Sequence, residues 1–206
     1  QVGVFWNNKL NVSLPVVQPR ANWTSTFVKF SPLGSYLFSI HPQGVQSWGR
    51  SEFDQIGRFF HPNVRLIDIS PNEKYLVTLS PDPITLPPED HVNRAKFPFS
   101  AKDEGNQLVI WDILTELPKK TFALPSSLQN SKKLPWPLIK WSHDDKYCAR
   151  AGPDAIAVYE SETMELLGKQ IIKIPGVLDF DWAPAGVALD ANKKTKELSS
   201  VLAYWV

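Results

Sequence analysis

The sequence predicts an all-β fold made of repeated four-stranded sheets. Four blocks of the chain each join an alternating apolar segment to a tight polar turn and then to a second apolar segment, which is the pattern of a β-hairpin. The blocks recur at a regular spacing, since Ser31 to Ser70 is 39 residues and Trp141 to Trp182 is 41. A further apolar segment with an aromatic residue near its end follows each of the first three hairpins. A period of about 40 residues with four strands per unit is typical of a WD40-like β-propeller.

The elements follow one another in a fixed order. The hairpins are expected at 27–37, 66–76, 138–148 and, in degenerate form, 178–188; third strands at 44–48, 108–112 and 155–159, with similar segments at 2–6 and 201–205; and fourth strands at 55–60, 119–124 and 166–171. Both end segments read as third strands, so the two partial sheets are not expected to combine into one blade. The prediction is an arc of about four blades, three complete and two partial, from a larger ring.

One blade carries an insertion. Ser70 to Ser142 is 72 residues, and leaving out the proline-rich stretch 81–106 reduces this interval to 46. The predicted organisation is a partial blade 1–20, a blade 21–61, a blade 62–125 with the insertion 81–106, a blade 126–174 and a partial blade 175–206.

Large aromatic residues are expected to form the core of the repeat. The predicted set is Trp48, Trp111, Asp112, Trp141, Trp182 and Trp205. The chain has a single Trp-Asp pair and no Gly-His dipeptide, so the polar network of typical WD40 repeats is not expected in full. Burial of aromatic side chains, each contributing roughly 1.5–3 kcal/mol, should carry more of the stability.

Composition narrows the class of protein. The formal net charge of +1 offers no general excess of cations for binding nucleic acid. The single cysteine, Cys148, cannot form an internal disulfide and is expected to be buried. No apolar run is long enough to span a bilayer, and the first residues lack the charged start of a signal peptide. These features predict a cytoplasmic location without membrane contact.

The residues that usually carry chemistry do not form a catalytic pattern. His41, His61, His91 and His143 lack metal-ligand spacing and are assigned to turns or the surface. The adjacent Ser142-His143-Asp144 fits a hydrogen-bonded turn, because neighbouring residues in a turn cannot form a catalytic relay. We therefore expect no enzyme activity, cofactor or metal. A small-molecule site enclosed by the propeller, or a general protein-interaction platform, is the alternative function.

The insertion has two interpretations. It is either a mobile surface loop or a partner-docking arm with Phe97 and Phe99 as anchors. In the second case the cations Arg94, Lys96 and Lys102 could bind phosphate, and further candidate contacts to partners or rRNA are Lys119, Lys120, Lys132 and Lys133. Charge clusters of this kind are also common on solvated faces and strand edges.

Several longer blocks resemble a known family. They include Asn22-Trp23-Thr24, His41-Pro42-Gln43-Gly44-Val45, Ser70-Pro71-Asn72-Glu73-Lys74-Tyr75-Leu76, Asp145-Lys146-Tyr147-Cys148-Ala149-Arg150 and Leu202-Ala203-Tyr204-Trp205. In this order they resemble the b subunits of eukaryotic translation initiation factor 3, the fungal forms especially. The likeness covers essentially the whole chain and is weakest in the insertion and in 188–200.

The resemblance implies a nine-bladed propeller, preceded by an RNA-recognition domain and followed by a helical tail. It implies a scaffold without enzymatic activity and without a small-molecule substrate. The implied partners are the ribosomal protein and rRNA of the small ribosomal subunit, together with the other subunits of initiation factor 3.

Overall fold

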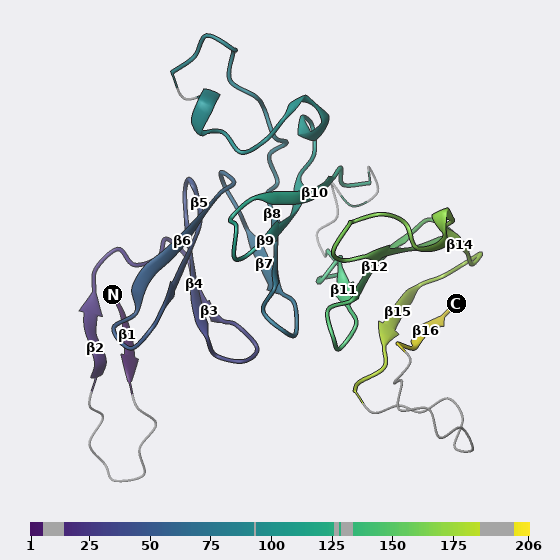
Figure 1. Cartoon of the computed structure of the whole chain (residues 1–206), viewed down its shortest axis with the longest axis horizontal. Coiled ribbons are helices and arrows are strands. Elements are labelled where there is room, and N and C mark those ends of the chain that lie inside the picture. Colours follow the sequence, from purple (N-terminus) through teal and green to yellow (C-terminus); the bar gives the residue numbers. More distant parts are fainter. Residues whose placement is uncertain (6–14, 93, 126–127, 129–133, 186–199) are drawn as a thin grey trace. The chain divides into compact units, whose positions relative to one another are not determined.

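The computed structural model describes residues 1–5, 15–92, 94–125, 128, 134–185 and 200–206. Strands β1 to β16 form five antiparallel sheets within these residues (Figure 1). The chain divides into two compact units, the first Gln1–Ile69 with Tyr75–Gln129 and the second Ser70–Lys74 with Asn130–Val206. The helices η1, η2 and η3 are short 3-10 turns, and no helix in the described part of the chain is long and apolar enough to cross a membrane.

The first unit contains one two-stranded and two four-stranded sheets. The strands are β1 Val2–Phe5 and β2 Pro15–Arg20; β3 Val28–Phe30, β4 Tyr36–His41, β5 Gly44–Gly49 and β6 Asp54–Phe60; and β7 Leu66–Ile69, β8 Tyr75–Leu79, β9 Leu108–Asp112 and β10 Pro118–Phe122. Two 3-10 turns, η1 Arg94–Lys96 and η2 Ala101–Asp103, lie between β8 and β9. In each four-stranded sheet the strands lie side by side in chain order, as in a propeller blade.

The second unit contains one further four-stranded sheet and a two-stranded sheet. The elements are β11 Lys140–Trp141, β12 Tyr147–Gly152, β13 Ala155–Glu160, η3 Leu167–Lys169, β14 Ile172–Lys173, β15 Asp179–Trp182 and β16 Leu202–Trp205. The predicted fold class, all-β with WD40-like propeller blades, is confirmed.

Two sequence predictions fail in this unit. The predicted fourth strand at 166–171 is interrupted by the 3-10 turn η3, in which Gly168 has a φ of 66° that an extended strand does not adopt, and the pairing strand β14 comes later. The segment 201–205 was predicted as a third strand, yet β16 pairs directly with the first strand β15, with Phe180 opposite Tyr204. It therefore occupies the place of a second strand. Its aromatic ending resembles those of the third strands, but the place of a strand in a sheet depends on the strand with which it pairs.

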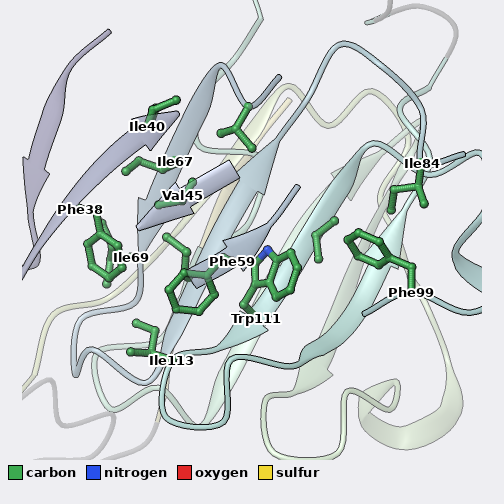
Figure 2. Close-up of a cluster of buried hydrophobic side chains, with 13 residues drawn as sticks. Phe38, Ile40, Val45, Phe59, Ile67, Ile69, Ile84, Phe99, Trp111 and Ile113 are labelled. Atoms are coloured by element: carbon green, nitrogen blue, oxygen red, sulfur yellow. The ribbon is translucent and has the colours of Figure 1, made fainter. Parts of the chain in front are cut away.

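Aromatic and branched side chains fill the core of the first unit. Figure 2 shows Phe38, Phe59, Trp111 and Phe99 among Ile67, Ile69 and Ile84. The ring centroids of Phe59 and Trp111 are 5.7 Å apart, in a T-shaped arrangement that aromatic pairs favour. These residues come from both four-stranded sheets and from the insertion, so the insertion contributes to the core of its own unit.

The second unit has a smaller core of Ala149, Ile156, Val158, Ile174 and Phe180. Tyr147 and Trp182 stack against each other beside it, with ring centroids 6.3 Å apart. The predicted burial of Cys148 is confirmed, and burial raises the pKa of its thiol to about 12.

The first strands of neighbouring sheets are joined by an ion pair in each unit. Lys29 Nζ lies 2.9 Å from Asp68 Oδ1 in the first unit, and Lys140 Nζ lies 2.9 Å from Asp179 Oδ1 in the second. Lys140 also donates to the backbone oxygen of Phe180 at 2.6 Å. In each unit the pair therefore links the starts of two successive sheets.

Candidate partner-binding surface

The insertion folds back onto its own blade. Ile84 N donates to Asn106 O at 2.8 Å and Gly105 N donates to Ile84 O at 2.9 Å, so its two ends are held together. Phe99 is 4% exposed and its ring centroid lies 5.5 Å from that of Trp111. Phe97 packs against Phe60 at 5.0 Å. Phe99 is therefore buried within the chain and not available to a partner, whereas Phe97 is half-buried and its role as an anchor stays a prediction.

Asp103 ties the end of the insertion to β10. Its carboxylate accepts hydrogen bonds from Ser100 N and Oγ and from Thr121 Oγ1, at 2.8 to 2.9 Å. Burial favours the neutral form of this carboxyl, but these hydrogen bonds and the charge of Lys102 outweigh it and lower its pKa. The insertion is thus fixed by both apolar and polar contacts.

The predicted basic contacts differ in their surroundings among the described residues. Arg94 donates to the backbone oxygen of Phe99 at 3.2 Å, which is a structural role within the insertion. Lys119 lies 5.8 Å over the ring of Tyr75, Lys120 is half-buried and Lys102 is exposed. The side chain of Lys96 and the whole of Lys132 and Lys133 lie outside the described residues.

The predicted repeat core divides into buried and exposed members. Trp111 is 0% exposed and Trp141 is 7% exposed, whereas Trp48 and Trp182 are half-buried. Trp205 is 51% exposed, contrary to expectation, since it lies on the two-stranded β15–β16 sheet. Asp112 is half-buried and accepts a hydrogen bond from Thr115 N at 2.8 Å, so it shapes the β9–β10 turn instead of filling the core.

Sequence reasoning missed a buried histidine. His61 is 1% exposed, and its Nδ1 lies 2.8 Å from Thr78 Oγ1. Thr78 Oγ1 in turn accepts a hydrogen bond from Trp111 Nε1 at 2.8 Å. Burial lowers the pKa of His61 from 6.5 to about 4, so this histidine is neutral at physiological pH. The expectation of a surface role is therefore wrong for His61, although it does lie in the turn directly after β6.

A similar network occurs one sheet earlier with a different histidine. Trp48 Nε1 donates to Ser39 Oγ at 2.7 Å, and Ser39 Oγ lies 3.0 Å from His41 Nε2. Trp23, which sequence reasoning left out of the core, is 3% exposed and packs edge-on against Trp48 at 5.4 Å. Arg20 covers Trp23 at 4.8 Å. A tryptophan–hydroxyl–histidine network thus forms in two sheets without any Gly-His dipeptide.

An open groove lies at the β4–β5 hairpin. We call it the hairpin groove; it encloses about 420 Å³ and is lined by His41, Pro42, Gln43, Gly44, Val45, Gln46, Arg58, Phe59 and Phe60. Gly44 makes the turn possible, because it has a φ of 142° and an added Cβ would lie 2.1 Å from Phe59 O. Partial burial, and then the nearby charge of Arg58, lower the pKa of His41.

Other chemistry is not evident in the described residues. Ser142 Oγ donates to Asp144 Oδ1 at 2.7 Å, and Asp144 Oδ1 accepts from Lys146 N at 3.1 Å, as expected for a polar turn. No group of three or more His, Cys, Asp or Glu side chains that could hold a metal ion occurs in the described part of the chain. The hairpin groove is therefore taken as the candidate site.

The repeated four-stranded meander sheets define a protein of the β-propeller class. No family model matches the chain. The b subunit of eukaryotic translation initiation factor 3 from Lodderomyces elongisporus is 57% identical over 99% of the chain, as is that from Candida albicans, and that from Yarrowia lipolytica is 46% identical over 99%. The chain is thus homologous to a segment of the fungal initiation factor 3 b subunits, as its sequence blocks indicated.

The chain spans about 28% of the length of these curated relatives. A solved crystal structure described as "the eukaryotic initiation factor" aligns with a TM-score of 0.60 over 82% of this chain and 37% of that one. At 16% identity this likeness supports the fold alone.

Proposed function

We propose that this chain is a non-catalytic scaffold segment of a translation initiation factor. It would dock on the small ribosomal subunit in the cytoplasm and hold other subunits of initiation factor 3 in place. The observation that carries this proposal is the 57% identity to named b subunits of initiation factor 3 over nearly the whole chain. The geometry is compatible with it, because antiparallel sheets with ion-paired first strands form a rigid support for surface loops.

The mechanism is multivalent binding. The formal net charge is only +1, so each loop would add a modest contact to ribosomal protein or rRNA backbone. The rest of the complex would supply the avidity that makes the sum of these contacts strong.

Co-sedimentation tests this function. The longer protein that contains this segment is assembled with its partner subunits and centrifuged with purified small ribosomal subunits, at salt concentrations from about 50 to 200 mM. We expect co-sedimentation that weakens as salt rises, and a clear loss when the segment is deleted. Unchanged sedimentation after the deletion would contradict the proposal.

A further inference from the structure

The hairpin groove places polar side chains on one face of the β3–β6 sheet. Gln46 of β5 pairs with Ser39 of β4 on one side and with Arg58 of β6 on the other. His41 lies two residues beyond Ser39 and therefore points to the same face. The opposite face carries Phe38, Val45 and Phe59, which are packed in the core of the unit. His41, Gln46 and Arg58 thus lie on the face away from this core, where Arg58 is exposed and Ser39 is itself buried.

The charge in the groove is one-sided. Its nine lining residues include Arg58 and His41 and no carboxylate. Glu116 lies beside β6, and its carboxylate accepts the backbone N–H of Arg58 at 3.0 Å. The guanidinium of Arg58 donates to the amide oxygen of Gln55 at 3.2 Å, a neutral partner. A charged acceptor would make a stronger hydrogen bond to this guanidinium than the amide does.

We propose that the hairpin groove binds an acidic peptide segment of a partner protein. A carboxylate of that segment would pair with Arg58 beside His41. The side-chain amides of Gln43 and Gln46 would bind its backbone groups. This proposal rests on the scaffold function above and names a kind of partner for it.

The groove is less suited to nucleic acid. Single-stranded RNA binds to exposed aromatic faces on which bases stack and to a track of several cations. Here Phe59 is 1% exposed, and Phe60 is engaged with Phe97 at 5.0 Å. One permanent cation, Arg58, in a groove of about 420 Å³ matches a single carboxylate better than a run of phosphates, because the lowered pKa of His41 disfavours a second positive charge there.

Fluorescence anisotropy of the whole chain tests the proposal with three labelled probes. The first is a short peptide of alternating Glu and Leu, the second is the same peptide with Gln in place of Glu, and the third is a short oligouridine. The variant Arg58→Gln removes the groove's permanent cation. Arg65→Gln is the matched control, because Arg65 is an exposed cation that does not line the groove.

We expect the acidic peptide to bind and the Gln peptide to bind much more weakly. Loss of a charge-assisted pair should weaken the acidic peptide about tenfold in Arg58→Gln, while Arg65→Gln stays near wild type. Circular dichroism confirms that both variants are folded. Equal binding in Arg58→Gln, no binding of the acidic peptide, or Arg58-dependent binding of the oligouridine alone would each overturn the proposal.

Failure of this inference is distinguishable from failure of the scaffold function. If Arg58→Gln leaves peptide binding unchanged while the longer protein still co-sediments with small ribosomal subunits, only the groove assignment is wrong. If co-sedimentation does not need the segment, the scaffold function is wrong whatever the peptide does.

Discussion

The β7–β10 and β11–β14 sheets both place an aromatic residue near the end of the third strand, but they differ in the side chains that surround it. Trp111 lies opposite Leu76 in the first, and Thr78, two residues further, supplies the hydroxyl that links Trp111 to His61. At the corresponding positions of β11–β14, Tyr159 of β13 lies opposite Cys148 of β12, and the residue two positions after Cys148 is Arg150. The aromatic anchor is kept, while the hydroxyl–histidine network is absent from those positions. Apolar packing is therefore the common requirement of these sheets, and the polar network is an addition.

The largest expected effect comes from the anchor itself. Trp111→Ala removes a side chain that is 0% exposed and should destabilise the chain by about 3–5 kcal/mol through lost burial and the cavity left behind. Trp205→Ala is the matched control, since its ring is 51% exposed and should cost far less. Urea unfolding measures both. Equal losses would show that burial does not separate the two tryptophans.

The next effect is a pH dependence located in the β7–β10 network. The pKa of His61 is about 4 in the folded chain and 6.5 ordinarily, so the unfolded state binds more protons between these values. Stability should fall by roughly 3 kcal/mol as pH drops from 6.5 to 4. Urea unfolding at several pH values measures this, and His61→Gln should have a flatter profile than His91→Gln. A parallel pair of profiles would contradict the burial of a neutral His61.

A smaller effect should distinguish the two tryptophan–hydroxyl–histidine networks. Thr78→Val keeps the shape but leaves Trp111 Nε1 and His61 Nδ1 without their partner in a dry site, at a cost of about 1–3 kcal/mol. Ser39→Ala should cost less, because Trp48 and His41 are half-buried and water can reach them. Differential scanning calorimetry compares the two variants. A larger loss for Ser39→Ala would reverse this ranking.

The fold was predictable from the sequence because repeat spacing and hairpin turns are local signals. The hairpins around Ser31, Ser70 and Ser142 were predicted close to where they lie. The role of β16 was not predictable, because the position of a strand in a sheet depends on which strand it pairs with and not on its aromatic ending.

The candidate site was less predictable than the fold. Phe97 and Phe99 look like exposed anchors in a proline-rich segment, and only the fold brings them against Phe60 and Trp111. His41 and Arg58 are 17 residues apart in the chain and line one groove through the pairing of β4, β5 and β6. Convergence of this kind depends on register, which composition does not reveal.

A segment exchange tests the central claim most directly. The matching segment of the Candida albicans protein is replaced by this chain, and the chimaera is supplied as the only copy of that protein. We expect cells to grow and the chimaera to sediment with small ribosomal subunits, whereas deletion of the segment abolishes both. A stable, folded chimaera that supports neither growth nor sedimentation would contradict the claim that this chain is a scaffold segment of a translation initiation factor.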